Sequence, residues 1–271
     1  MGPGPQSRVW LITGCSSGFG PQLAKVPAAR GDRVLAASRN REKARDLSGQ
    51  ENIKVVLLDY NDDLAKIREA ISGFAEIWGH IDVVVNNAAY VQTGTIEETT
   101  PEKTLRQFQA NVFGPLNLYR AVLPLLWTRG HGTLVTIGSM AAWYPMNSCN
   151  LYNASKAALR WATLGLADEP GANLAGTLPT ARLPEYDEIN RVADDNFRKF
   201  NGKQLGDPIK GAEIIYDAVT STGVAEGKEF PSFLPLGSDA AAEISKAAQK
   251  NLDDAQKWRP ISALSDFPEG A

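Results

Sequence analysis

The first half of the chain contains five short apolar runs that are hydrophobic on both faces rather than at alternate positions. These runs are rich in β-branched residues. Such runs suit strands of a parallel sheet that helices cover on both sides. The predicted strands cover residues 9–13, 33–38, 53–59, 81–87 and 132–139.

The segments between these runs are long enough to form the helices that connect parallel strands. The predicted helices cover residues 18–29, 41–48, 62–78, 101–128 and 151–167. This alternation predicts an α/β fold of the Rossmann type, with a doubly wound, mostly parallel sheet and helices on both faces. Pro27 lies inside the first predicted helix, where it would cost about 3 kcal/mol unless the helix kinks or ends there.

The second half of the chain is less regular. An apolar stripe at helical spacing predicts a helix over residues 186–200. Asp207 followed by Pro208 predicts the start of another helix, because Asp is a good N-cap and Pro suits the first turn. Residues 228–237 are predicted as a strand, which two prolines restrict to an edge or an interrupted course.

The sequence fits one domain over residues 1–258, with a substrate lid near 180–206 and a loosely ordered tail over 259–271. A chain of 271 residues, 43% hydrophobic and 22% charged, suits one large α/β domain. A net charge of −3 argues against nucleic-acid binding, which needs a clustered basic excess.

Several other classes of protein are disfavoured by what the sequence contains. No apolar run is long enough for a membrane span, and the N-terminus lacks the hydrophobic core of a signal peptide. Cys15, Cys149, His80 and His131 offer neither a disulfide framework nor the spacing of a metal site. We therefore expect a cytoplasmic protein that binds no metal.

The glycine-rich stretch TGCSSGFG, residues 13–20, follows the first predicted strand and precedes a helix. Its glycines permit a tight turn and a close approach of the backbone to a pyrophosphate, and the following helix presents unpaired N–H groups. A turn with a purely structural role is the alternative. The residues expected to touch a dinucleotide are Gly14, Ser16, Ser17, Gly18, Phe19 and Gly20.

The second predicted strand ends in Ser38 and is followed by Arg39, where an NAD site would place an acid for the ribose hydroxyls. A hydroxyl and a guanidinium can hold the 2′-phosphate of NADP(H), which an Asp would repel. The alternative is that Arg39 is only a surface arginine. The pair favours NADP(H) as the cofactor.

In the stretch NLYNASKAAL, residues 150–159, Tyr152 and Lys156 lie four positions apart within a predicted helix. This spacing places both side chains on one face, near enough to interact. Taken alone, the spacing does not separate a chemical pair from two neighbours on a surface.

Together these features resemble the short-chain dehydrogenase/reductase family. The matching motifs occur in order along nearly the whole chain, which makes the resemblance specific. The C-terminal half looks like that of fungal and bacterial members close to the hydroxysteroid dehydrogenase-like branch. The motifs are TGCSSGFG, Asp59, NNAA at 86–89, Asn111, Ser139 and Tyr152-x-x-x-Lys156.

The resemblance implies a role for each catalytic residue. Tyr152 would be the general acid and base, and Lys156 would lower its pKa and bind the nicotinamide ribose. Ser139 would hold the substrate carbonyl, and Asn111 would maintain the proton relay to Lys156. Because a free tyrosine has a pKa near 10, work near neutrality implies a pKa for Tyr152 depressed by roughly three units.

The resemblance also carries over further cofactor contacts. Asp59 would meet the adenine, and Asn86 and Ala88 would lie along the ribose and nicotinamide. Pro170 and Gly171 match the Pro-Gly pair that covers the nicotinamide in the family.

The sequence departs from the family pattern after the helix of Tyr152. Glu169 leads directly into Pro170, whereas the family has a sixth strand before its Pro-Gly pair. That strand, usually about five residues, is therefore missing or replaced. One interpretation is an imperfect gene model or a splice form. Another is a sheet that closes differently, with residues 173–178 or 228–237 beside the fifth strand, and a third is a compromised fold.

The resulting hypothesis is an NADP(H)-dependent oxidoreductase that transfers a hydride between the nicotinamide and a carbonyl or secondary alcohol of a lipophilic small molecule. The rivals are a non-catalytic NADP(H)-binding sensor or scaffold, and a destabilised variant that lacks a sheet strand. Family members usually associate through the helices that match residues 101–128 and 151–167, so a homodimer or homotetramer is expected.

Overall fold

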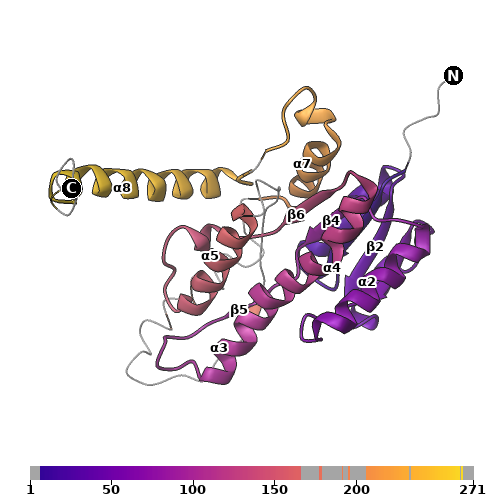
Figure 1. Ribbon diagram of the computed structural model, residues 1–271, viewed down its shortest axis with the longest axis horizontal. Helices are drawn as coiled ribbons and strands as arrows, with labels where there is room; N and C mark the ends of the chain where they lie inside the picture. Colours follow the sequence, from indigo (N-terminus) through magenta and orange to yellow (C-terminus); the bar gives the residue numbers. More distant parts are fainter. Residues whose placement is uncertain are drawn as a thin grey trace, which may run out of the picture.

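The structure is a computed structural model that describes residues 7–165, 177–178, 191, 195, 206–231, 233–262 and 264. Its centre is a five-stranded sheet in the order β3-β2-β1-β4-β6, and every pair of neighbouring strands is parallel (Figure 1). All five predicted strands are confirmed. They are β1 (Val9–Thr13), β2 (Arg33–Ser38), β3 (Ile53–Leu57), β4 (Val83–Asn86) and β6 (Thr133–Thr136).

The strand order reverses beside β1, which pairs with β2 on one side and β4 on the other. Leu11 is thus opposite Leu35 in one neighbour and Val84 in the other. In an open α/β sheet, the loops at the carboxyl ends of two strands diverge at such a reversal and leave a crevice for ligands. The fold therefore places its binding site after β1 and β4.

Helices cover both faces of the sheet. Because strand side chains alternate, Leu11 and Leu35 pack in one core with α2 and α4, while Trp10 and Val34 pack in the other with α1 and α7. This two-sided burial explains why the strands read as continuous apolar runs. The α-helices are α1 (Gly20–Ala29), α2 (Leu64–Trp78), α3 (Pro101–Phe108), α4 (Gly114–Arg129), α5 (Asn150–Gly165), α7 (Pro208–Thr220) and α8 (Ser238–Ser262).

Two predicted helices differ from expectation in their type. The helix predicted over residues 41–48 is a short 3-10 helix, η1 (Glu42–Leu47). The helix predicted over 101–128 is divided into α3 and α4 by a turn of π-helix, η2 (Gln109–Phe113). Such π-turns inside helices are frequent at functional sites.

The helix ends follow the predicted capping chemistry. The Asp207 carboxylate accepts hydrogen bonds from the backbone N–H groups of Ile209 and Lys210, which confirms it as the N-cap of α7. Pro27 lies in the last turn of α1, which ends two residues later at Ala29. The missing N–H of this proline therefore removes only one bond of the last turn.

Within the described residues the sheet ends at β6. Thr177–Leu178, strand β7, pairs in parallel with β5 (Val91–Gln92) in a separate two-stranded sheet rather than with β6. The strand predicted over 228–237 is wrong, because its described residues form no ladder. The two prolines in this segment remove N–H donors that a ladder needs.

The long helix α8 was not predicted. It continues through residues 259–262, where the sequence analysis expected a loosely ordered tail. Its sequence is rich in Ala and Lys, which favour helix, but Ile244 is its only buried side chain among the described residues. Figure 1 shows α8 projecting away from the sheet, which explains the weak apolar pattern.

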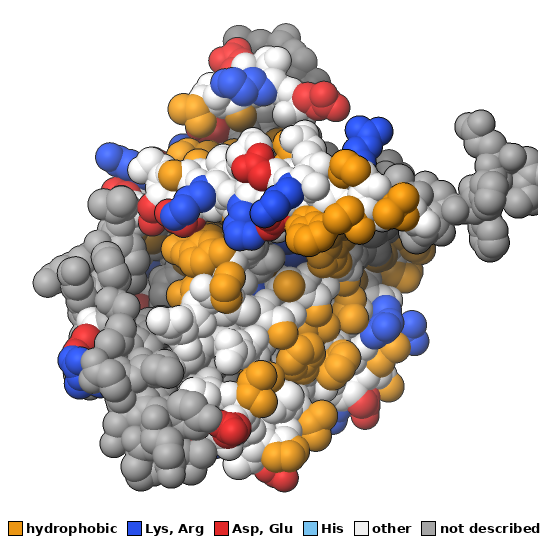
Figure 2. Space-filling model, turned by 90° about the vertical axis from the view of Figure 1, so that its left-hand side faces the viewer, with side chains coloured by type: hydrophobic (Ala, Val, Ile, Leu, Met, Phe, Trp, Pro, Cys, Tyr) orange, Lys and Arg blue, Asp and Glu red, His pale blue; other side chains and the backbone are white. Residues whose placement is uncertain are grey.

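No described helix is both long and apolar enough to cross a membrane. The surface nevertheless carries large apolar side chains, including Trp127 on α4 and Trp161 on α5. Figure 2 shows hydrophobic side chains gathered in a broad patch on one face, below a mixed group of acidic and basic side chains.

Candidate active site

The four residues expected to be catalytic lie on neighbouring elements. Ser139 follows β6 and caps the 3-10 helix η3 (Met140–Ala142), while Tyr152 and Lys156 lie one turn apart on α5. Asn111 lies in the π-turn η2. Helix α5 contacts both η2 and η3, and all four side chains are buried.

The Tyr152 hydroxyl is a buried polar group without a hydrogen-bond partner among the described residues. Burial raises the pKa of Tyr152; the nearby Ser139 hydroxyl opposes this rise, and Cys149 adds to it. The expected depression of the pKa is therefore wrong for the ligand-free chain. The phenol packs against apolar neighbours, and Lys156 does not offset its burial. These neighbours are Val91, Ala141 and Cys149, with Met146 beside them.

The Lys156 ammonium points toward the end of β6. Its Nζ donates a hydrogen bond of 2.7 Å to the carbonyl oxygen of Ile137. Burial lowers its pKa to about 7, because the charged form loses hydration and no salt bridge replaces it in the described part of the chain. The side chain can thus change its charge near neutral pH.

Asn111 joins two parts of the site through its amide. Its Oδ1 accepts from the backbone N–H of Tyr90 at 3.0 Å, and its Nδ2 donates to the Tyr90 carbonyl at 2.8 Å. The same Nδ2 donates to the Ser155 hydroxyl at 3.1 Å, and Ser155 donates to the Tyr152 carbonyl at 2.8 Å. Asn111 therefore fixes the loop after β4 against the helix that carries Tyr152 and Lys156.

The glycine-rich loop forms one wall of a cleft of about 880 Å³ at the strand-order reversal. Gly14 has φ +72°, and a Cβ there would come within 2.8 Å of the Ala88 Cα atom. Gly18 has φ +63° and open space beside it. Of the predicted cofactor-binding residues, those that line the cleft are Gly14, Ser16, Ser17, Gly18, Phe19, Ser38, Arg39, Asp59 and Ala88.

Helix α1 starts at this cleft with Gly20. Its N-cap, Phe19, has no side chain that can accept a hydrogen bond from the first turn. No capping oxygen therefore neutralises the positive end of the helix. An anion site requires such a free helix start. Pro21 has no N–H, so the first turn offers one donor fewer than usual.

Arg39 is an exposed cation at the rim of the cleft, without a hydrogen bond or ion pair to any described residue. Ser38 is buried, and its hydroxyl donates to the Asn40 carbonyl at 2.8 Å. Burial raises the pKa of Tyr90, and the positive charges of Arg106 and Arg39 oppose the rise. Sequence reasoning missed Tyr90 and Arg106, because no spacing rule connects them with Arg39.

The Asn86 side chain points into the protein, away from the cleft. Its Oδ1 accepts from the Tyr60 hydroxyl at 2.7 Å, and its Nδ2 donates to the Tyr119 hydroxyl at 2.8 Å. The next residue, Asn87, lines the cleft instead and donates from Nδ2 to the Thr13 carbonyl at 2.8 Å. Alternation along β4 predicts such opposite orientations once the register is known.

Some predicted residues are not covered by the structure. Pro170, Gly171 and nearly all of the predicted lid over 180–206 lie outside the described residues.

Comparison with known proteins shows that the chain is similar to short-chain dehydrogenases and other oxidoreductases. The sequence model of the short chain dehydrogenase family matches residues 8–173. Oxidoreductase BOA17 of Botryotinia fuckeliana is 29% identical over 280 residues, which cover 96% of this chain and 99% of that protein. The NADP-dependent 3-hydroxy acid dehydrogenase YdfG of Shigella flexneri is 31% identical over 231 residues, which cover 83% of this chain and 89% of YdfG.

A solved structure agrees with these sequence matches. A short-chain dehydrogenase from Streptomyces avermitilis superposes with a TM-score of 0.85 at 29% identity. The match covers 97% of this chain and all of that one. The similarity therefore extends beyond the nucleotide cleft to nearly the whole fold.

Proposed function

This chain belongs to the short-chain dehydrogenase/reductase family and is an oxidoreductase; we propose that it transfers a hydride between NADP(H) and a carbonyl or secondary alcohol of a lipophilic small molecule. One observation carries the proposal. A buried tyrosine hydroxyl without a hydrogen-bond partner among the described residues lies one helical turn from a buried lysine and beside a buried serine. A substrate oxygen would complete the hydrogen bonding of that hydroxyl.

The nicotinamide cofactor, when bound, supplies the hydride that adds to the carbonyl carbon. Tyr152 gives its hydroxyl proton to the carbonyl oxygen as negative charge develops there. The Ser139 hydroxyl accepts a hydrogen bond from the Ala141 N–H at 3.0 Å, so its own proton is directed elsewhere. Ser139 can therefore donate to the same oxygen and hold it beside the phenol.

When Lys156 is protonated, its positive charge lowers the energy of the Tyr152 phenolate. In the ligand-free chain its pKa of about 7 leaves the ammonium partly deprotonated at neutral pH. A hydroxyl-rich ribose would return hydrogen-bond acceptors to this buried cation and favour its charged form. Asn111 is a positioning residue, because it reaches the backbone of α5 through Ser155 and not the reacting atoms.

The cleft residues fit a phosphorylated dinucleotide. Gly14 and Gly18 keep the turn free of side chains, and the uncapped start of α1 suits a pyrophosphate. Arg39, together with the neighbouring Ser38, would hold a 2′-phosphate. Asp59 and Ala88 line the same cleft. The NADP dependence of the relative YdfG supports this choice of cofactor.

A nucleotide titration with a panel of ketones tests the proposal. Nucleotide fluorescence should saturate with NADPH at lower concentration than with NADH, and NADPH should be consumed with at least one ketone. Tyr152→Phe should lower kcat by about 10²- to 10⁴-fold while NADPH still binds. Tyr216→Phe, the same change at a remote buried ring stacked on Trp10, is the control and should keep its activity.

The possible outcomes separate the rival functions. NADPH binding without turnover, unchanged in Tyr152→Phe, would leave a non-catalytic nucleotide-binding protein. No binding of either nucleotide to a cooperatively folded protein would exclude both functions.

The proposal includes self-association through α4 and α5. Trp127 is 65% exposed and Trp161 is 67% exposed, a large apolar area for two neighbouring helices. An open groove beside them is lined by Leu116, Leu123 and Pro124, and also by Arg68 and Arg120. A second copy of the chain would bury these side chains, and light scattering of the purified protein would give the oligomeric state.

A further inference from the structure

A second pocket, separate from the nucleotide cleft, lies beside β6. It offers about 710 Å³ of space, part of which is open to solvent. Its walls come from the end of β6, from α7, from residues 230–236 and from the start of α8. No charged side chain is among the described residues that line it.

The pocket lies beside β6, the last strand of the described sheet. One edge of β6 pairs with β4, and no described strand pairs with the other. Residues 230–236 pass nearby, but Pro231 and Pro235 prevent a regular ladder. In the described part of the chain, side chains of α7, of residues 230–236 and of α8 border this space.

The pocket wall is apolar but only partly buried. Val135 and Ile137 at the base belong to the core, whereas Phe230, Phe233 and Leu234 keep part of their surface accessible. Apolar surface in a concave site gains free energy when an apolar ligand covers it. An uncharged ligand body suits these walls better than a polar one.

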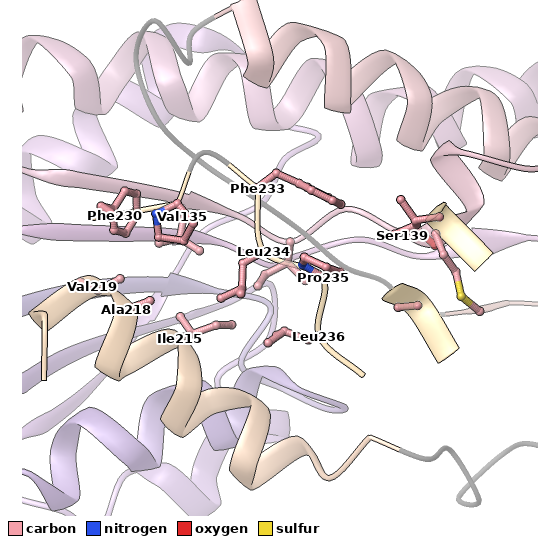
Figure 3. Close-up of a pocket in the computed structure, with 15 residues that line it drawn as sticks. Val135, Ser139, Ile215, Ala218, Val219, Phe230, Phe233, Leu234, Pro235 and Leu236 are labelled. Carbon is pink, nitrogen blue, oxygen red and sulfur yellow. The ribbon is translucent and has the colours of Figure 1, made fainter. Parts of the chain in front are cut away.

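Ser139 connects this pocket with the proposed chemistry. It lines the pocket together with Met140, and its hydroxyl lies close enough to Tyr152 to affect the pKa of the phenol. Figure 3 shows Ser139 at one end of the labelled residues and Phe230 at the other. A ligand held by its oxygen at Ser139 could extend along β6 toward Phe230.

We propose that this pocket binds the apolar body of the substrate, and that the substrate is an elongated, uncharged carbonyl compound such as a long-chain ketone. This inference rests on the proposed function, because it assumes that the carbonyl lies between Ser139 and Tyr152. A carboxylate-bearing substrate would need a cation, and the described residues of the pocket wall include no Lys or Arg. The relative YdfG acts on 3-hydroxy acids, so the two proteins would differ in substrate class.

A series of methyl ketones from 2-butanone to 2-dodecanone tests the inference with NADPH. In the wild type, kcat/KM should rise about three- to fourfold per added methylene until the pocket is full. Ala240→Phe places a ring in the pocket from α8. It should lower the ratio of kcat/KM for 2-dodecanone to kcat/KM for 2-butanone at least tenfold. Ala242→Phe, an exposed position on the same helix, is the matched control and should retain the advantage.

A binding measurement gives a readout that does not depend on turnover. The uncharged dye N-phenyl-1-naphthylamine should bind saturably to the wild type and to Ala242→Phe, and at least tenfold more weakly to Ala240→Phe. 2-Dodecanone should displace it at concentrations where 2-butanone does not.

The two proposals can fail separately. Ketone turnover without dependence on chain length, or equal dye binding by the two variants, overturns the pocket assignment and leaves the oxidoreductase chemistry intact. Dye binding that Ala240→Phe weakens, in a protein that reduces none of the ketones, overturns the proposed carbonyl reduction and with it the assignment of the pocket to its substrate.

Discussion

The ammonium of Lys156 donates a hydrogen bond of 2.7 Å to the carbonyl oxygen of Ile137, and this bond joins the middle of α5 to the end of β6. Lys156 is 1% exposed and forms no ion pair in the part of the chain that the structure describes. Burial therefore lowers its pKa to about 7. The lysine is held in place by an uncharged oxygen, which leaves its charge sensitive to pH and to bound ligand.

The first prediction concerns the pH dependence of stability. An unfolded lysine titrates near pH 10.4, so between about pH 7 and pH 10 the unfolded chain binds more protons at Lys156 than the folded chain does. The free energy of unfolding should therefore rise with pH in this window, by at most about 1.4 kcal/mol per pH unit. Lys156→Met should lose this contribution.

Urea unfolding of the ligand-free wild type and of Lys156→Met at pH 6.5, 7.5 and 8.5 measures the difference. The wild type should gain stability relative to the variant as the pH rises. Parallel curves would show that the lysine keeps an ordinary pKa in the folded chain.

A second prediction concerns the choice between the two nucleotides. Arg39→Ala should raise the Kd for NADPH about 10- to 100-fold, because one hydrogen-bonded charge pair is worth about 1.5 to 3 kcal/mol. The Kd for NADH should stay within about twofold, since NADH has no 2′-phosphate. Arg41→Ala, an exposed arginine that does not line the cleft, is the control. An equal loss for both nucleotides would assign Arg39 a general role rather than recognition of the 2′-phosphate.

A third prediction concerns a chain of ring contacts behind the site. The Arg160 guanidinium lies 3.7 Å from the centre of the Trp143 ring, and Trp143 packs on Phe233 with centroids 5.5 Å apart. These contacts join α5, the loop after Ser139 and the wall of the apolar pocket. A double-mutant cycle of Arg160→Met and Trp143→Leu should give a coupling energy of about 0.5 to 2 kcal/mol in urea unfolding. A coupling near zero would show that the two side chains do not interact in solution.

The sheet was predictable from the sequence because both of its faces are covered. The strands β1, β2, β4 and β6 are buried along nearly their whole length and are therefore apolar on both sides. The edge strand β3 is less regular, because Lys54 and Leu57 are exposed. The capping of α7 by Asp207 was predictable for a similar reason, since it depends only on its immediate neighbours. Local rules therefore sufficed for these elements.

The elements and side-chain orientations that the sequence did not predict depend on what packs against each segment. Residues 228–237 have the composition of a strand, but none of their described residues forms a ladder with another strand. Helix α8 has little apolar face because it leaves the body of the protein. The Asn86 side chain turns inward because Tyr60 and Tyr119, distant in sequence, meet it there.

The raised pKa of Tyr152 has the same origin. The spacing of Tyr152 and Lys156 was readable from the sequence, but the free energy of burying each group was not. Burial acts on both side chains before any ligand is present, raising the pKa of the phenol and lowering that of the ammonium. The sequence alone therefore did not predict that the pKa of Tyr152 is raised in the ligand-free chain.

The last prediction concerns a contact that holds α7 against α1 and is remote from the chemistry. Asp217 accepts a hydrogen bond from Arg30 at 2.6 Å and another from the Val224 backbone N–H at 3.1 Å. Burial acts to raise the pKa of the Asp217 carboxyl, but these bonds outweigh it, so the pKa lies below its usual value. The carboxylate thus stabilises the fold above the pKa of an unfolded Asp, and this contribution is lost as the pH falls through the folded value.

Asp217→Asn should lower the free energy of unfolding at pH 7 by about 1 to 3 kcal/mol, because it weakens bonds to a charged, buried acceptor. The difference from the wild type should shrink as the pH falls below about 3.9, the pKa of an unfolded Asp, because the unfolded wild-type chain then binds protons that the folded carboxylate does not. Asp46→Asn removes the charge of an almost fully exposed carboxylate and should change stability little. A loss for Asp217→Asn that stays constant down to pH 3 would assign the effect to packing rather than to charge. NADPH binding should remain within about twofold of the wild type in both variants at pH 7, since α7 supplies no residue to the nucleotide cleft.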